Sequence, residues 1–120
     1  MSANPQRMQL SRKAGFNLQA ASKALNGLPA KRITRPGPWG NPFTIEETAD
    51  KYGLEPGAAQ AKAVALCGDW LRGKLDPKLS PGDPPSRAVI RQELAGHNLA
   101  CWCKPGTACH ADVLIDLANG

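Results

Sequence analysis

Residues 98–119 read NLACWCKPGTACHADVLIDLAN, and this stretch predicts the class of the fold. Asn98–Cys103 is a short apolar run of the kind that forms a buried strand. Lys104–His110 follows as a tight loop that contains proline and glycine. Ala111–Asn119 then places apolar side chains at helical spacing. A strand, a tight loop and a helix in this order form half of an α/β unit, and the backbone N–H groups at the start of such a helix can bind an anion.

The rest of the chain predicts the remaining elements of a small α/β domain. Strands are expected at Arg7–Arg12 and Lys31–Thr34. Helices are expected, from capping residues and apolar spacing, at Leu18–Leu25, Ile45–Tyr52, Ala58–Arg72 and Arg87–Leu94. We therefore predict one domain over residues 1–120, with residues 1–6 as a loose tail. Its class is α/β, a single small Rossmann-like layer domain with a short, mostly parallel sheet flanked by helices.

Charge is distributed unevenly along the chain. The formal net charge is +5, and no acidic side chain occurs before residue 46. This asymmetry favours an anionic partner such as a nucleotide, a phosphosugar or a nucleic acid, and a solvated basic face is the alternative interpretation. The sequence contains no long apolar span and no signal-peptide pattern, so we expect no membrane partner and a cytoplasmic location in which thiols stay reduced. No feature of the sequence indicates the oligomeric state.

Three of the four cysteines lie close to a histidine near the C-terminus. Cys101, Cys103, Cys109 and His110 offer the four ligands that zinc prefers. Side chains two residues apart on an extended strand, however, lie about 6–7 Å apart, which is too far for two sulfurs on one zinc ion. Adjacent side chains such as Cys109 and His110 also diverge unless the backbone bends. No metal is therefore favoured, and zinc on these four residues is the alternative. Cys67 lies in the middle of a predicted helix and is expected in the core.

A second interpretation of the same loop is a reactive or ligand-positioning site. Cys109 lies just before a helix, where the helix dipole lowers the pKa of a thiol. His110 can exchange protons near neutral pH. Asp112 lies in the first helical turn, where it can also simply complement the dipole. Of Cys101 and Trp102, one must face the core, because neighbours on a strand point to opposite faces.

Residues 35–43, RPGPWGNPF, form the second candidate loop, because three prolines and two glycines exclude regular structure. Trp39 can stack on a base, and Asn41 can recognise a base edge. Arg35 can bind a phosphate, and Arg12 can join the same site from the end of the first strand. In the alternative interpretation the rings of this loop fill the core, Asn41 only fixes a turn, and Arg12 forms a surface salt bridge.

Several sequence blocks spread over most of the chain form a recognisable pattern: Gln9-Leu10-Ser11-Arg12, Arg35-Pro36, Trp39-Gly40-Asn41-Pro42-Phe43, Cys101-Trp102-Cys103, Cys109-His110 and Asp112-Val113-Leu114. Through these blocks the chain resembles a family of small bacterial and phage proteins called domain of unknown function 4326. It departs from the family pattern at Ala14-Gly15-Phe16, where members often carry Lys-Gly-Trp. It departs again at Gly96-His97, where members often carry Gly-Lys. The family name implies no particular activity.

These observations favour an enzyme that acts on a nucleotide, a nucleoside or a base in nucleic acid, either as a hydrolase or as a transferase. The layout also resembles compact Rossmann-like domains that bind nucleotides and cleave or transfer N-glycosidic bonds, an analogy of architecture alone. In this hypothesis His110 and Asp112 transfer protons, and the two loops face each other across one cleft. The expected substrate-binding residues are Arg12, Arg35, Trp39, Asn41, Cys103, Thr107 and Cys109.

The sequence leaves two other functions open. The first is a non-catalytic module that binds nucleic acid and is stabilised by zinc on Cys101, Cys103, Cys109 and His110. The second is a small adaptor that binds another protein through the proline-rich loop at residues 35–43.

Overall fold

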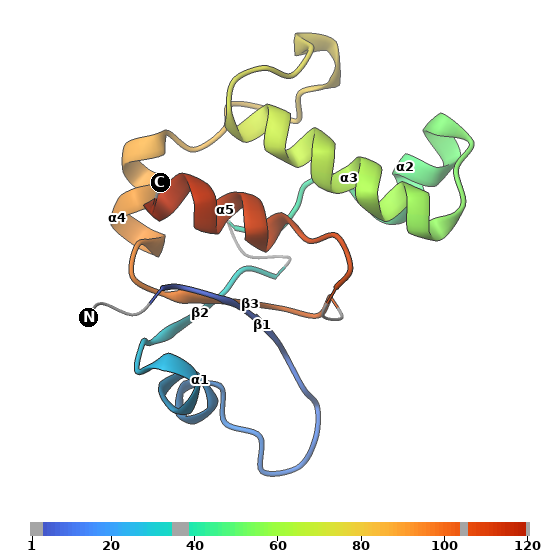
Figure 1. The fold of residues 1–120 in the computed structure, drawn as a ribbon. Helices are drawn as coiled ribbons and strands as arrows, with labels where there is room; N and C mark the ends of the chain where they lie inside the picture. Colours follow the sequence, from blue (N-terminus) through green and yellow to red (C-terminus); the bar gives the residue numbers. More distant parts are fainter. Residues whose placement is uncertain (1–3, 35–38, 104–105, 120) are drawn as a thin grey trace.

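The computed structural model describes residues 4–34, 39–103 and 106–119, and Figure 1 shows their arrangement. Three parallel strands form the sheet in the order β1-β3-β2. They are β1 at Arg7–Gln9, β2 at Ala30–Arg32 and β3 at Asn98–Cys101. The last strand along the chain therefore lies in the middle, with β1 and β2 paired parallel to it on either side. This arrangement confirms the predicted α/β class with a short parallel sheet.

Helices cover both faces of this sheet. Figure 1 shows α1 on one face and α4 and α5 on the other, with α3 and α2 packed beyond α5. The helices are α1 at Leu18–Asn26, α2 at Ile45–Tyr52, α3 at Pro56–Leu71, α4 at Arg87–Leu94 and α5 at His110–Asn119, with a 3₁₀ turn η1 at Pro77–Leu79. No helix in the described part of the chain is long and apolar enough to cross a membrane.

Local capping chemistry explains where the helices begin. The side chains of Asn17, Thr44 and Ser86 each accept a hydrogen bond from the backbone N–H three residues further on. Each bond satisfies one of the N–H groups that the first turn of a helix leaves unpaired. The predicted starts of α1, α2 and α4 are therefore confirmed, because a cap depends only on residues close in sequence.

The core lies between the sheet and the helices α4 and α5. It contains fully buried aliphatic side chains from each of these layers, among them Ile33, Ile90, Leu94, Leu99 and Leu114. All four residues of β3 are buried, as expected for a central parallel strand with helices on both faces. The hydrophobic core thus fixes β3 and the start of α5 against each other.

Several predicted boundaries are wrong: the strand expected at Lys31–Thr34 is Ala30–Arg32, the helix expected at Ala58–Arg72 is Pro56–Leu71, and the ends of two other strands also differ. The strand expected at Arg7–Arg12 ends at Gln9, and the strand expected at Asn98–Cys103 ends at Cys101. The last ladder bond on this side joins Leu10 N–H to the carbonyl of Cys101, over 2.7 Å. Strands persist only while a neighbour pairs with them, so the chain is free to bend after Cys101.

The predicted loose tail also differs from the structure in its described part, residues 4–6. The backbone N–H of Gln6 donates to Asn98 Oδ1 over 2.9 Å, and the carbonyl of Gln6 accepts from Leu99 N–H over 3.0 Å. Asn26 donates to the carbonyl of Asn4 over 3.0 Å. These bonds attach the residues just before β1 to the sheet and to α1.

Candidate functional site

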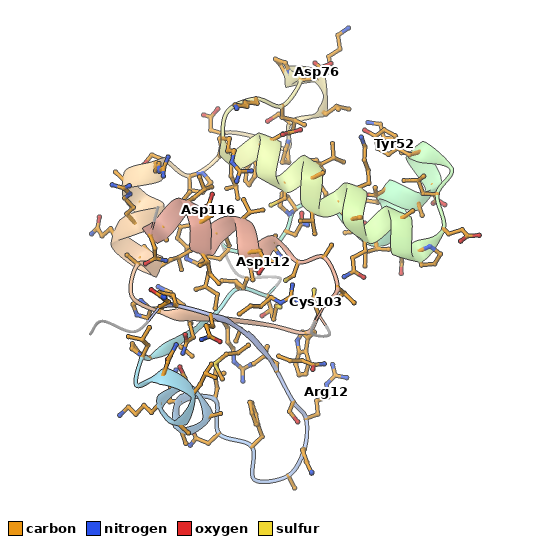
Figure 2. All side chains as sticks on the ribbon, viewed as in Figure 1. Arg12, Tyr52, Asp76, Cys103, Asp112 and Asp116 are labelled. Carbon is orange, nitrogen blue, oxygen red and sulfur yellow. The ribbon has the colours of Figure 1, made fainter. Side chains whose placement is uncertain are left out.

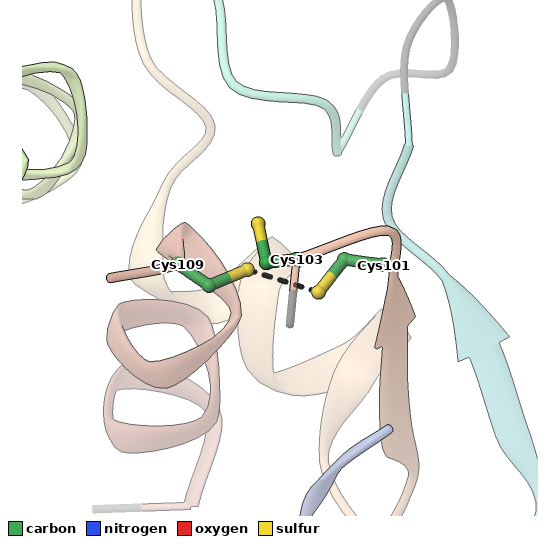
Figure 3. Close-up of side chains that lie close together, drawn as sticks. All are labelled: Cys101, Cys103 and Cys109. Atoms are coloured by element: carbon green, nitrogen blue, oxygen red, sulfur yellow. Dashed lines mark hydrogen bonds between the residues drawn. The ribbon is translucent and has the colours of Figure 1, made fainter. Parts of the chain in front are cut away.

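Three cysteines meet where β3 ends and α5 begins (Figure 3). Cys101 is the last residue of β3, Cys103 follows two residues later, and Cys109 directly precedes α5. The three sulfur atoms lie within 4.8 Å of one another, and the sulfurs of Cys101 and Cys109 are 3.0 Å apart. Cys101 and Cys109 are buried, whereas Cys103 is partly exposed. Among the residues that the structure describes, these three sulfurs form a set that can hold a metal ion.

This cluster overturns the spacing objection to a metal site. The objection assumed an extended strand through Cys103, but the strand ends at Cys101 and the chain bends at Trp102. The bend brings the Cys103 sulfur back toward its neighbours. Zinc–sulfur bonds of about 2.3 Å in a tetrahedron place two sulfurs about 3.8 Å apart. The sulfurs of Cys101 and Cys109 are closer than this value, and no pair in the cluster is more than 4.8 Å apart, so the spacing no longer argues against a metal ion.

His110, the first residue of α5, is held by two backbone carbonyls. Its Nε2 lies 3.0 Å from the carbonyl oxygen of Ile33 and 2.9 Å from that of Trp39. Because both oxygens are acceptors, Nε2 must carry the ring proton. The other ring nitrogen, Nδ1, lies 4.0 Å from the sulfur of Cys109. The chain turns into α5 between Cys109 and His110, so these two side chains stay in contact, but among the described residues only the three cysteines, without His110, form the close set of ligand atoms.

The three thiols do not share the same affinity for protons. A hydrogen bond from Cys109 lowers the pKa of Cys101 to about 6. The same bond, in which Cys109 acts as the donor, raises the pKa of Cys109, and burial raises it further. Burial also raises the pKa of Cys103. At neutral pH the metal-free cluster therefore carries one thiolate, centred on Cys101.

This distribution corrects the expectation that the helix dipole lowers the pKa of Cys109. The N–H of Ala111 does point at the Cys109 sulfur over 3.5 Å, and this contact favours the thiolate. The proton that Cys109 shares with Cys101, together with burial, outweighs the contact. The helix start thus contributes to the site without making Cys109 its thiolate.

The cluster forms one wall of a cavity of about 340 Å³. Asn41 and Phe43 line the same cavity from the loop before α2, and Gln60 lines it from α3. All three cysteines and His110 line it from the end of β3 and the start of α5. The expectation that the two loops share one cleft is therefore confirmed for these residues. The volume falls within the range of pockets that bind small organic ligands.

The expected ligand-binding residues of the first loop have structural partners instead. Trp39 is 8% exposed and belongs to the core, which agrees with the interpretation that its ring fills the core. Asn41 accepts from the N–H of Phe43 over 2.8 Å and donates to the carbonyl of Ala63 over 3.3 Å, so it fixes the turn at the cavity wall. Arg35 lies outside the described residues.

The expected proton-transfer pair is separated in the structure. Asp112 forms an ion pair with Arg7 over 3.0 Å, and its side chain is 64% exposed. Arg7 also donates to the backbone carbonyl of Thr107 over 2.7 Å. The backbone of Thr107, an expected substrate-binding residue, therefore already has an arginine as its partner. Residues two apart on a helix face different directions. His110 therefore lines the cavity. Asp112, labelled in Figure 2, lies at the surface beside Arg7 of β1.

The sequence did not point to several residues that line the cavity, among them Gln60, Thr34 and Trp102. Gln60 donates to the carbonyl of Ala108 over 2.6 Å and so connects α3 to the cysteine loop. Thr34 lines the cavity after the end of β2, and Trp102 lines it between two of the cysteines. Only Trp102 could have been identified from the sequence, because it follows Cys101 on a predicted strand and neighbouring side chains on a strand face opposite sides. That alternation is confirmed, with Cys101 inward and Trp102 45% exposed.

Comparison with known protein families gives a match over nearly the whole chain. A family described as a domain of unknown function (DUF4326) matches residues 16–120. The chain belongs to this family. The match confirms the resemblance carried by the tryptophan loop and the cysteine blocks, and both walls of the cavity lie inside the matched region. No curated protein and no solved structure matches the chain.

Proposed function

We propose that this chain is a zinc-dependent enzyme that acts on a nucleobase-containing small molecule, a nucleoside or a nucleotide, bound in the cavity beside the cysteines. The proposal rests on one observation, three sulfurs within 4.8 Å of one another in the wall of a cavity of about 340 Å³. A cluster of this kind in a reducing compartment favours metal binding or catalysis over a disulfide.

The donor set fits zinc. Cys101, Cys103 and Cys109 would hold the ion, and their sulfurs already lie within 4.8 Å of one another, close to the spacing of about 3.8 Å that tetrahedral geometry requires. Three protein ligands leave the fourth position for a water or a ligand atom, and three cysteines are one of the ligand sets that nucleobase deaminases use. When bound, the metal would polarise a water molecule or a substrate atom at that position.

The cavity fits a flat ring. Its lining is mainly apolar, with Phe43 and Ile45 on one side, and its polar groups include Thr34, Asn41 and Gln60. Apolar walls with a few directed polar groups are typical of sites that bind heterocyclic ligands. No aspartate or glutamate is found among the described lining residues, so proton transfer falls to His110. In hydrolysis, His110 Nδ1 would take a proton from the attacking water, whose oxygen bonds to the substrate, and return it to the leaving group.

Metal content tests the first half of the proposal. The protein purified without chelators should contain one zinc ion per chain by elemental analysis. Cys101→Ser, Cys103→Ser and Cys109→Ser should each lose most of it, because each removes one of only three thiolate ligands. Cys67→Ala is the matched control, since Cys67 is buried in α3 and lies outside the cluster. A folded protein without zinc, even after zinc is supplied, would overturn the proposal.

Turnover tests the second half. Nucleosides and nucleotides should be incubated with the zinc-loaded protein and separated by chromatography. His110→Gln should keep a donor near the carbonyls of Ile33 and Trp39 but lack the Nδ1 acceptor, so we expect a loss of turnover by about 10²–10⁴-fold with the fold intact. Asp112→Asn should keep turnover, since Asp112 lies on the surface with Arg7.

One observation favours the non-catalytic alternative. His110 Nδ1 lies 4.0 Å from the Cys109 sulfur, and its Nε2 contacts backbone carbonyls, as the second nitrogen of a metal-binding histidine commonly does. If Nδ1 is the fourth ligand, the site is closed and stabilises a module that binds nucleic acid. His110→Gln then loses zinc, and binding to nucleic acid falls steeply with salt. Retention of zinc by this variant supports the enzyme.

A further inference from the structure

We infer that the ligand of this cavity carries a phosphate, with its ring inside the cavity against Trp102 and its phosphate outside on Arg12. This inference rests on the proposed function and narrows it from nucleobase compounds in general to nucleotides. Its evidence comes from the mouth of the cavity, where a tryptophan and an arginine form a pair that the metal site does not require.

The exposed surface of the molecule concentrates apolar side chains at this mouth. Among the described residues, four large apolar side chains are exposed, Leu25, Ile45, Val89 and Trp102. Ile45 and Trp102 both line the cavity, although they come from the start of α2 and from the end of β3. An exposed tryptophan beside an apolar cavity leaves a flat face on which a base can stack, and such stacking tolerates any base.

Arg12 extends this platform with a positive charge. Its guanidinium carbon lies 4.7 Å from the centre of the Trp102 ring, and Figure 2 places Arg12 at the same end of the sheet as Cys103. A guanidinium that stacks on a ring uses its face and keeps its N–H groups at the edge for an anion. None of the ion pairs between described residues involves Arg12. Arg7, by contrast, forms an ion pair with Asp112.

The metal site sets the direction in which such a ligand lies. Zinc held by three thiolates carries one net negative charge, and the described lining contains no lysine or arginine. A phosphate is therefore repelled from the inner wall and attracted to the guanidinium beside the mouth. In this arrangement the ring would lie inside the cavity on the side of the cysteines, and the phosphate would lie on Arg12.

The inference is tested by titrating the zinc-loaded protein with nucleosides and with their 5′-monophosphates in a calorimeter at constant salt. We expect the monophosphate of the accepted base to bind about tenfold more tightly, since charge-assisted hydrogen bonds of this kind contribute on the order of 1.5 kcal/mol. Arg12→Gln should reduce the monophosphate to the affinity of the nucleoside and leave the nucleoside unchanged. Trp102→Ala should weaken both by about tenfold through lost stacking.

Two controls separate this inference from the proposed function. Lys23→Gln removes an exposed cation on α1 and should change neither affinity. Zinc content should be unchanged in Arg12→Gln and Trp102→Ala. Equal affinity for nucleoside and monophosphate, or a monophosphate affinity that Arg12→Gln does not alter, would reject the phosphate contact and leave the proposed function standing. Binding of neither compound would reject both.

Discussion

The two ends of β3 both carry buried polar side chains, but they are built differently. At the first end, Asn98 is fully buried and donates to Ser22 over 2.7 Å and to Asn26 over 2.8 Å. Its oxygen accepts from Gln6 N–H and from Asn26, each over 2.9 Å. At the other end, three thiols share protons and face a cavity.

This difference separates a structural network from the candidate functional site. The asparagine network uses every donor and acceptor on its own neighbours, so it stabilises the fold and has nothing left to offer a ligand. The thiols pair mainly with one another, and their hydrogen bond lowers the pKa of Cys101 and raises that of Cys109. Perturbed pKa values beside a cavity are typical of functional sites. Ligands also bind commonly at the carboxyl ends of parallel strands, where this cluster lies.

Metal removal should produce the largest effect. A chelator should lower the free energy of unfolding by several kcal/mol, because zinc at about a thousand times its dissociation constant stabilises a fold by about 4 kcal/mol. The measurement is thermal unfolding with and without chelator. Cys103→Ser should unfold at the same temperature in both conditions. If the wild-type protein melted at the same temperature with and without chelator, the cysteine end of β3 would not differ from the asparagine end by a bound metal.

The next largest effect should be the pH dependence of zinc affinity. At pH 7 Cys101, with a pKa of about 6, is already ionised, while the raised pKa values keep Cys103 and Cys109 protonated. Binding should therefore release about two protons, and affinity should fall about a hundredfold per pH unit on acidification. Below pH 6 Cys101 is protonated as well, so the slope should approach three protons. Calorimetry in buffers of different ionisation enthalpy measures this number, and a value near zero would contradict the assignment.

Asn98→Ala should have a smaller effect, confined to stability. It removes one buried partner from Ser22, two from Asn26 and the acceptor of the Gln6 N–H, which should cost about 2 kcal/mol in urea unfolding. Zinc content should not change. Asn119→Ala, which removes two exposed hydrogen bonds, one to the carbonyl of Ile115 and one from the N–H of Gly96, is the control and should cost less than about 1 kcal/mol. A loss of zinc in Asn98→Ala would show that the two ends are coupled.

Asp112→Asn should have the smallest effect. It breaks an ion pair with Arg7 whose acidic partner is mostly exposed, and such pairs contribute less than about 1 kcal/mol. The measurement is urea unfolding, with turnover followed in the same samples. A large loss of turnover at unchanged stability would return Asp112 to the proton-transfer role that the sequence suggested.

The cavity was only partly predictable from the sequence. The two loops that form it could be identified because proline, glycine, cysteine and histidine concentrate there. The role of each aromatic residue could not, since an isolated tryptophan has equal reason to lie in the core or at a mouth. Trp39 lies in the core, and the exposed ring at the cavity belongs to Trp102.

Local chemistry in the sequence determined the helices, the family and the order of elements. Asn17, Thr44 and Ser86 start helices through bonds to residues three positions away, so no distant partner is needed. Tertiary structure alone decided where β3 stops, because a strand ends where its neighbours cease to pair with it. That ending brings the Cys103 sulfur within 4.8 Å of those of Cys101 and Cys109, and so creates a set of sulfurs that could hold a metal ion.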